Sequence, residues 1–127
     1  MKVGSWNIEG LNSSIDDVDF LNVIETFDLI CLCETWQKSN VGYTLDGFES
    51  ISVPRPESLL AKSKRGHGGL CLFYKSHLKN GITVVEKDSS GFLWIKLCKV
   101  FFGTEDDTYI CFSYIPPSYS VYYDLHR

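Results

Sequence analysis

Apolar and polar residues along the chain form a series of short apolar runs separated by turn-forming stretches rich in Gly, Asn, Asp and Ser. Runs of this length, bounded by such stretches, predict β-strands. The run at 29–33 is continuous rather than alternating, which indicates a strand buried on both faces. The expected strands cover residues 2–8, 28–34, 48–53, 68–76, 81–87, 91–101 and 108–115.

A helix is expected between the first two strands, over residues 13–28. Ser14 is the expected N-cap, with Asp17 three residues later as a weak capping box. The apolar face would consist of Ile15, Val18, Leu21, Val23, Ile24 and Phe27.

The order strand, helix, strand at the start predicts a βαβ unit with two parallel strands. Short turns between the later strands predict antiparallel pairing. We therefore expect one twisted mixed sheet with a helix on one face. The late strands are apolar on both sides, so the second face also needs a cover, and the sequence offers no second convincing helix for it.

Length, net charge and cysteine content limit the classes of protein to which the chain can belong. The chain has 127 residues, which suits one domain, and a formal net charge of −4, which argues against a protein that coats nucleic acid through charge alone. The five cysteines are odd in number, lie in apolar runs and include no CxxC pair, so we expect reduced core thiols. Neither a signal peptide nor a membrane-spanning run is apparent, which predicts a soluble protein of the nucleus or cytoplasm without a membrane partner.

Two polar residues mark the ends of the first two expected strands. Glu34 follows the apolar run 29–33, and Asn7 ends the first strand. The carboxyl ends of parallel strands meet at one sheet edge, where α/β proteins bind ligands. A carboxylate there suits Mg²⁺, and an Asn can donate to a phosphate oxygen or orient a water. The alternatives are a glutamate that caps its strand in solvent and an asparagine that forms a turn.

Four stretches, in order, carry a resemblance: SWNIEGL, LICLCETW, GHGGLCLFYKS and FSYIPP. They resemble the first half of the endonuclease/exonuclease/phosphatase superfamily, and most of all the endonuclease domains of LINE-type retrotransposons. The resemblance runs from Lys2 to about Pro117. It implies an α/β fold, half of a four-layer α/β sandwich, with a mixed and mostly antiparallel sheet and a βαβ start. Residues 1–127 would be a partial domain, truncated after the Tyr-x-Pro-Pro segment.

The resemblance also implies an activity and its residues. The superfamily hydrolyses phosphodiester or phosphomonoester bonds with a divalent metal, here Mg²⁺, with Mn²⁺ as a substitute. Glu34 matches the metal-binding glutamate and Asn7 the active-site asparagine. Tyr114 matches the tyrosine that contacts the scissile phosphate. Glu9 stands where relatives often carry Asp or Asn near the metal, which gives it a second and weaker metal role.

The sequence departs from the family in what it lacks. Family members carry an Asp-x-Asn motif after the tyrosine segment and a Ser-Asp-His or similar motif near the end, and this chain has neither. We therefore expect an isolated chain without activity, which would act on DNA only if downstream sequence completed it. Pro117 stands where abasic-site endonucleases carry Asn, which favours the retrotransposon type. The alternatives are a non-catalytic relic that serves as a binding module and a phosphomonoesterase of the inositol-phosphate type.

Three further features have both a functional and a structural explanation. Lys62, Lys64 and Arg65 form a basic cluster, which is either a solvated loop or a contact to the DNA backbone. Gly68–Gly69 is expected to make a turn and close packing before a buried strand rather than a phosphate-binding loop. Trp36 is expected in the core rather than at the rim of the site.

Overall fold

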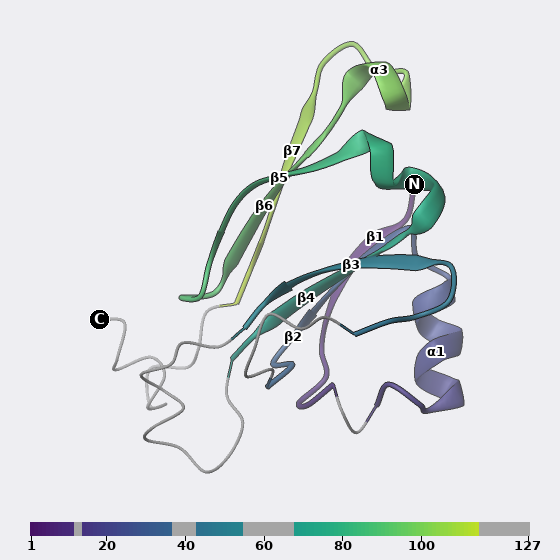
Figure 1. The fold of residues 1–127 in the computed structure, drawn as a ribbon, viewed down its shortest axis with the longest axis vertical. Coiled ribbons are helices and arrows are strands. Elements are labelled where there is room, and N and C mark those ends of the chain that lie inside the picture. The colour runs from purple at the N-terminus through teal and green to yellow at the C-terminus, as the bar shows by residue number, and fades with distance from the viewer. Residues whose placement is uncertain (12–13, 37–42, 55–67, 115–127) are drawn as a thin grey trace.

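Two β-sheets packed face to face, with one helix on the outer side of the larger sheet, form the protein in this computed structural model (Figure 1). The structure describes residues 1–11, 14–36, 43–54 and 68–114. The larger sheet has the order β1-β2-β4-β3 and the smaller one the order β5-β6-β7. Their strands are β1 (Val3–Asn7), β2 (Leu29–Cys33), β3 (Phe48–Val53), β4 (Leu70–Lys75), β5 (Ile82–Asp88), β6 (Phe92–Leu97) and β7 (Thr108–Ser113).

The predicted βαβ start is confirmed. Strands β1 and β2 are parallel, with Val3 opposite Leu29 and Asn7 opposite Cys33, and α1 (Val18–Glu25) connects them. All other strand pairs are antiparallel. No helix in the described parts of the chain is long and apolar enough to cross a membrane.

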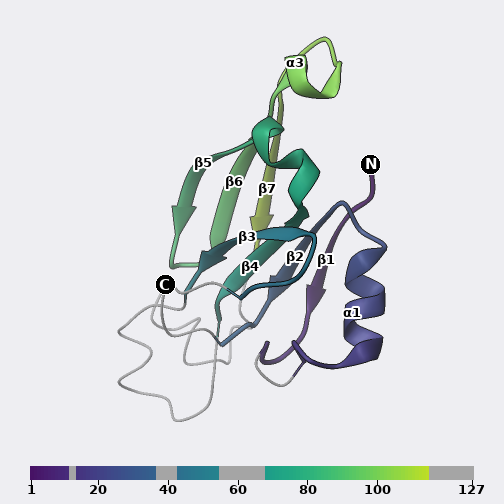
Figure 2. The same cartoon turned by 45° about the vertical axis from the view of Figure 1, so that its right-hand side comes forward.

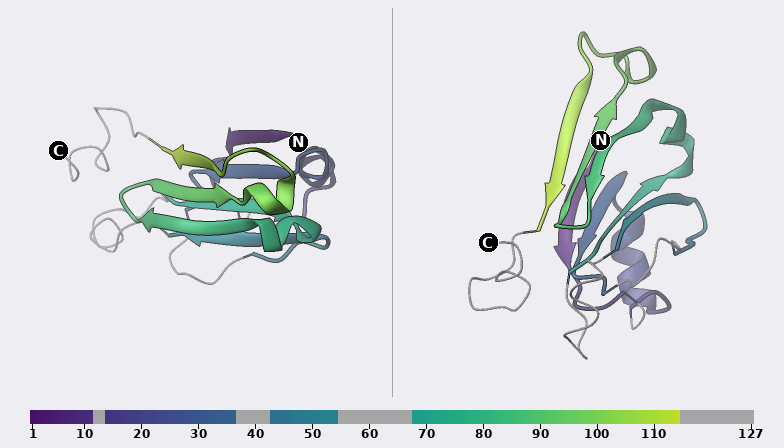
Figure 3. Two further views of the ribbon diagram at one scale, coloured as in Figure 1. Left: turned by 90° about the horizontal axis from the view of Figure 1, so that it is seen from above. Right: turned by 60° about the vertical axis from the view of Figure 1, so that its left-hand side comes forward.

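The expectation of a single sheet is wrong, whereas the half-sandwich is confirmed. After β4 the chain turns through the 3₁₀ helix η1 (Ser76–Gly81) and enters the second sheet instead of pairing again with the first. The second sheet thus provides the cover that the first sheet needed, and the layers follow one another as small sheet, large sheet and α1 (Figure 3, right).

The central strands explain why their apolar runs do not alternate. In β2, Leu29 and Cys31 belong to the core between the sheets, while Ile30 and Leu32 belong to the core beneath α1. Strand β4 divides its residues in the same way. Since each successive side chain of a strand points to the opposite face, a strand covered on both faces must be apolar throughout.

The helix begins later than predicted, and its apolar face is confirmed in part: Ile15, Leu21, Ile24 and Phe27 pack in the core beneath α1, as predicted. Asp17, not Ser14, is the N-cap: its side chain accepts from the backbone N–H of Asp19 (2.8 Å) and Phe20 (3.2 Å). Phe20 and Ile24 are the buried residues of α1, and Phe20 packs on Trp6 with ring centroids 5.5 Å apart. Val18, at 69% exposed, was wrongly assigned to the buried face.

The predicted strand over 91–101 is too long. Strand β6 ends at Leu97, and the short helix α3 (Lys99–Phe102) follows. The Asp107 carboxylate accepts from the backbone N–H of Lys99 (2.8 Å) at the start of α3, and Gly103, with φ of 70°, ends it in the left-handed conformation. A hydrogen bond from Asp107, which lies outside the apolar run, therefore sets the boundary between β6 and α3.

All five cysteine thiols are free, as predicted, but they do not all lie in the core. Cys31 and Cys71 are buried, whereas Cys111 is exposed on β7. Burial raises the pKa of Cys71 to about 12.

This difference predicts selective alkylation of the native protein. At pH 8 iodoacetamide should modify Cys111 within minutes, because the reagent needs access and a thiolate, and should leave Cys71 intact until the protein unfolds. Peptide mass spectrometry before and after addition of denaturant measures the two sites. Modification of Cys71 at the rate of Cys111 would contradict its placement beneath α1.

Candidate active site

Three strands end at the same end of the sandwich. The arrowheads of β1, β2 and β7 all point there (Figure 2). Strands β1 and β7 are also edge strands, and they lie on the same side of the sandwich (Figure 3, left). The residues at or just after these ends are Asn7, Glu34 and Tyr114, so the topology gathers the three predicted residues at one end of the fold.

The Glu34 carboxylate is buried and held by neutral donors. Glu34 is 9% exposed. Its Oε1 accepts from the backbone N–H of Gly68 (3.0 Å) and its Oε2 from the indole N–H of Trp36 (3.1 Å). Within the part of the chain that the structure describes, no cationic side chain pairs with it, since the ion pair found there joins Lys75 to Asp28. A buried carboxylate without a cation carries a large desolvation cost.

The backbone around Glu34 is strained and tightly connected. Glu9, Glu34 and Trp36 have φ of 48°, 59° and 61°, which is the left-handed region that side chains other than glycine rarely adopt. Five backbone hydrogen bonds of 2.7 to 3.3 Å join residues 33–36 to residues 8–11 and 68–69. Strain of about 1–3 kcal/mol per residue persists only where surrounding contacts fix the backbone, and it is typical of functional sites.

Trp36 lies at the rim of this site, so its predicted place in the core is wrong. The side chain is half-buried, and its indole N–H holds Glu34. Its ring packs over Gly10, where an added Cβ would lie 2.7 Å from the ring. The turn after β1 thus positions Trp36, and Trp36 positions the carboxylate.

Substitution of Gly10 by alanine tests the contacts that link Gly10 to Trp36 and Trp36 to Glu34. The variant combines a strained φ of 103° with a Cβ that meets the Trp36 ring, so we expect a loss of about 1–3 kcal/mol in the free energy of unfolding. Gly47→Ala is the matched control, because Gly47 has a φ of 82° but nothing within 4 Å of an added Cβ. Urea unfolding measures both, and only Gly10→Ala should move the indole N–H signal of Trp36 in an NMR spectrum. Equal costs and an unmoved signal would contradict the packing of Trp36 on Gly10.

Gly68 and Gly69 contribute to the site. Both are buried directly before β4, which confirms the predicted close packing, their φ values of 69° and 91° are left-handed, and the N–H of Gly68 binds Glu34. The sequence reading missed this contact with Glu34. The sequence feature that could have indicated this contact is the Gly-Gly pair directly before a buried strand, where glycine readily adopts the left-handed backbone.

Asn7 makes the turn contact considered for it, and its contact to a phosphate or water stays a prediction. Its side-chain Oδ1 accepts from the backbone N–H of Glu9 (3.3 Å), which is the turn-forming contact. Its side chain is exposed at the mouth of the site, opposite Cys33 in the register. The Glu9 side chain is also exposed, and no contact joins it to Glu34 among the described residues.

Tyr114 follows β7 at the same end. Its backbone N–H donates to the carbonyl of Gly91 (2.9 Å), and its half-buried ring packs against the core between the sheets. Cys33, the residue before Glu34, packs against the same core. Tyr114 and Cys33 therefore pack against the same core, one from the small sheet and the other from the large sheet.

Thr35, the residue after Glu34, has an unsatisfied hydroxyl. Thr35 is 2% exposed, and its Oγ1 has no hydrogen-bond partner within the described residues. Buried hydroxyls are nearly always bonded, so such an atom indicates a place for a water or a ligand.

Comparison with known proteins identifies the family. The model of the Endonuclease/Exonuclease/phosphatase family matches residues 4–127. The chain belongs to this family. No curated protein matches it closely enough to add a nearer relative.

A solved structure of an AP endonuclease shares the fold. The AP endonuclease LMAP from Leishmania major is similar with a TM-score of 0.65 at 17% identity, over 96% of this chain and 42% of that one. The APE2 catalytic domain from Xenopus laevis matches with a TM-score of 0.44 at 25% identity, over 60% of this chain and 24% of that one. The chain therefore spans less than half the length of the AP endonuclease that it resembles.

Family members are generally dependent on a divalent metal, and the residues here fit one. Glu34 offers a carboxylate, and the next residue along the chain, Thr35, offers an unsatisfied hydroxyl. No group of three His, Cys, Asp or Glu side chains that could hold a metal occurs among the described residues. That set matches Mg²⁺, which takes one or two carboxylates and keeps several waters, rather than Zn²⁺. The basic cluster of Lys62, Lys64 and Arg65 lies outside the described residues, so its contact to DNA stays a prediction.

Proposed function

We propose that this chain forms the N-terminal part of a divalent-metal-dependent phosphodiesterase that nicks DNA. The observation that supports this function is the Glu34 carboxylate, which is buried at the mouth of β2 and bonded only by neutral donors within the described residues. A carboxylate in that environment is stabilised by a bound cation. Its place at a strand end, beside Asn7, is where such folds bind ligands.

Each residue has a role that follows from its contacts. A divalent cation, when bound, would neutralise charge on the phosphoryl oxygens. Glu34 would bind it, with the carboxylate oriented by Gly68 and Trp36. Asn7, whose Oδ1 accepts from Glu9, would direct its amide N–H groups at a phosphate oxygen. The Tyr114 hydroxyl would donate to the same phosphate.

The sequence resemblance supports DNA as the substrate and the retrotransposon type as the subclass. With a net charge of −4, the chain needs local basic groups to hold the DNA backbone, and Lys62, Lys64 and Arg65 are the candidates. We propose that these three lysine and arginine side chains contact phosphates flanking the scissile one, and that the protein works in the nucleus or cytoplasm.

The site as it stands should bind its metal without cleaving DNA. Phosphodiester hydrolysis needs a group that activates water, and the described residues place no second carboxylate or histidine in contact with Glu34. Incubated with supercoiled plasmid and Mg²⁺, the chain should give no more nicked circles than the Glu34→Ala variant. Nicking that Glu34→Ala abolishes would contradict inactivity but support the hydrolase assignment. Absence of both nicking and metal binding would support a non-catalytic binding module.

A further inference from the structure

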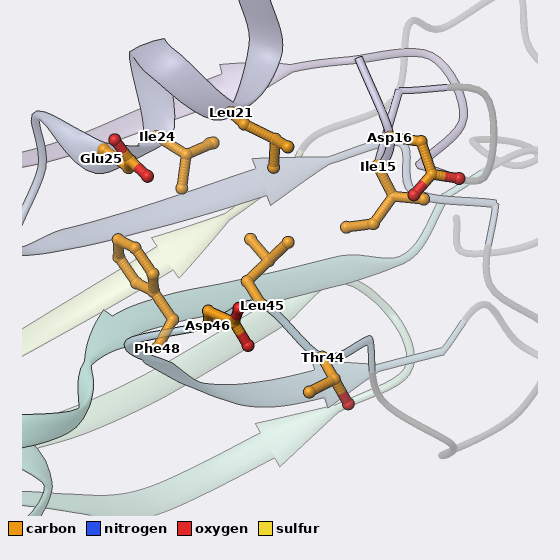
Figure 4. Close-up of a pocket in the computed structure, with 9 residues that line it drawn as sticks. All are labelled: Ile15, Asp16, Leu21, Ile24, Glu25, Thr44, Leu45, Asp46 and Phe48. Carbon is orange, nitrogen blue, oxygen red and sulfur yellow. The ribbon is translucent and has the colours of Figure 1, made fainter. Parts of the chain in front are cut away.

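A groove lies on the helix side of the large sheet, lined by none of the residues of the site described above. It runs between α1 and the segment that leads into β3, and it has a volume of about 340 Å³ (Figure 4). Leu21 and Ile24 of α1 point across it toward Leu45 and Phe48 (Figure 4). These four side chains and Ile15 make its apolar lining.

The rim of this groove is acidic. Asp16, Glu25 and Asp46 line it with exposed carboxylates, and no Lys, Arg or His occurs among its lining residues in the described parts of the chain. None of the three carboxylates makes a hydrogen bond or ion pair with another side chain in the described parts of the chain. Three like charges around an apolar slot repel phosphate, so this face disfavours nucleic acid.

A second hollow extends the groove beyond the segment. It has a volume of about 220 Å³ and shares Thr44 and Phe48 with the first. It adds a fourth carboxylate, that of Glu49, and the aromatic rings of Tyr43 and Tyr74. Two adjoining hollows suit successive side chains of an extended peptide better than one small cation.

We propose that this groove, lined by Ile15, Leu21, Ile24, Leu45 and Phe48, docks a short basic segment of a partner protein. One arginine or lysine of the partner enters the slot. Its methylene stem packs on the apolar lining, and its cationic head reaches the rim carboxylates of Asp16, Glu25 and Asp46. The adjoining hollow takes the neighbouring side chain. Charge complementarity and the apolar floor together select this occupant over an acidic or a purely apolar one.

The test uses the chain with a fluorescein-labelled peptide that carries two arginines around a leucine. Fluorescence anisotropy should show binding that weakens with salt, because exposed charges are screened. The triple variant Asp16→Asn, Glu25→Gln, Asp46→Asn should weaken it at least about tenfold. The matched control Glu86→Gln, Glu105→Gln, Asp106→Asn changes the same charge at exposed positions on β5 and before β7, and should bind within twofold of the original chain. Glu34 is unchanged in both triple variants, so their metal binding can be measured independently of peptide binding.

A second measurement on the unmodified chain keeps the proposal testable if a variant misfolds. In amide NMR spectra, the peptide should shift Leu21, Thr44 and Leu45, and a peptide with citrulline in place of arginine should not. Equal weakening in both triple variants, shifts elsewhere on the surface, or no binding at millimolar peptide would overturn the proposal. Displacement by spermidine at equal concentration would overturn the peptide as occupant in favour of a small amine.

Discussion

Replacing Glu34 with glutamine should weaken divalent-metal binding by about two orders of magnitude while leaving the fold intact. The substitution keeps an oxygen that can accept from the Gly68 N–H but removes the negative charge. The new amide also faces the indole N–H of Trp36 with a donor, where the carboxylate offered an acceptor. The loss of charge removes the attraction for the cation, and the mismatch disturbs its orientation.

Mn²⁺ added in NMR experiments gives a direct readout through the three tryptophan indole signals. The indole nitrogen of Trp36 lies 3.1 Å from a Glu34 oxygen, so bound Mn²⁺ should broaden its signal first. Trp94, exposed on β6 in the other sheet, should keep its signal at the same concentration. In Glu34→Gln the Trp36 signal should persist up to about a hundredfold more Mn²⁺.

The matched control is Glu49→Gln, which makes the same change at a half-buried glutamate near the start of β3. Its metal response should equal that of the original chain. Broadening of Trp36 in Glu34→Gln at the original Mn²⁺ concentration would place the cation on other ligands. A Trp36 signal that Mn²⁺ never broadens, even at millimolar concentration, would argue against a metal site and for a relic that binds a macromolecule.

The sequence predicted the position of Glu34 and Asn7 because that position depends on short-range order. A continuous apolar run, a preceding helix and a first strand suffice to make two parallel strands, and parallel strands bring their ends together. The register of Asn7 with Cys33 confirms this step. Whether these residues bind metal and phosphate stays a prediction.

The contacts that hold Glu34 could not be predicted, because they depend on pairing across the chain. Gly68 lies 34 residues after Glu34 and reaches it only because β4 pairs with β2 in the observed register. The partition into two sheets was missed for a related reason. Strand patterns look alike in one sheet or two, and the direction of the chain after β4 is set by η1, which the sequence shows only as a turn.

The buried face of α1 was predicted in part: Leu21, Ile24 and Phe27 pack on the core as expected, whereas Phe20 was missed. With Asp17 as N-cap, Phe20 and Ile24 face the sheet, four residues apart. Val18 and Val23 turn outward, with exposed fractions of 69% and 43%. The pattern of apolar residues left Phe20 off the buried face, where its contact with Trp6 places it.

Phe20→Ala should therefore destabilise the protein by about 3–5 kcal/mol, the cost of emptying a well-packed aromatic site. Phe20 is 5% exposed, packs on Trp6 and belongs to the core beneath α1. Since single domains of this size have about 5–15 kcal/mol of stability, the urea midpoint should fall by a large fraction. Equilibrium unfolding followed by circular dichroism measures it.

Val23→Ala, on the same helix, is the control. Its side chain is 43% exposed, so the substitution should change the free energy of unfolding by less than about 0.5 kcal/mol, and alanine's higher helix propensity acts in its favour. The two predictions are coupled, because one rotation of α1 sets both. A larger cost for Val23→Ala than for Phe20→Ala would mean that the helix buries Val23 and not Phe20. The same rotation would carry Leu21 and Ile24 away from Leu45 and Phe48, so a smaller cost for Phe20→Ala would also remove the apolar floor of the acidic groove.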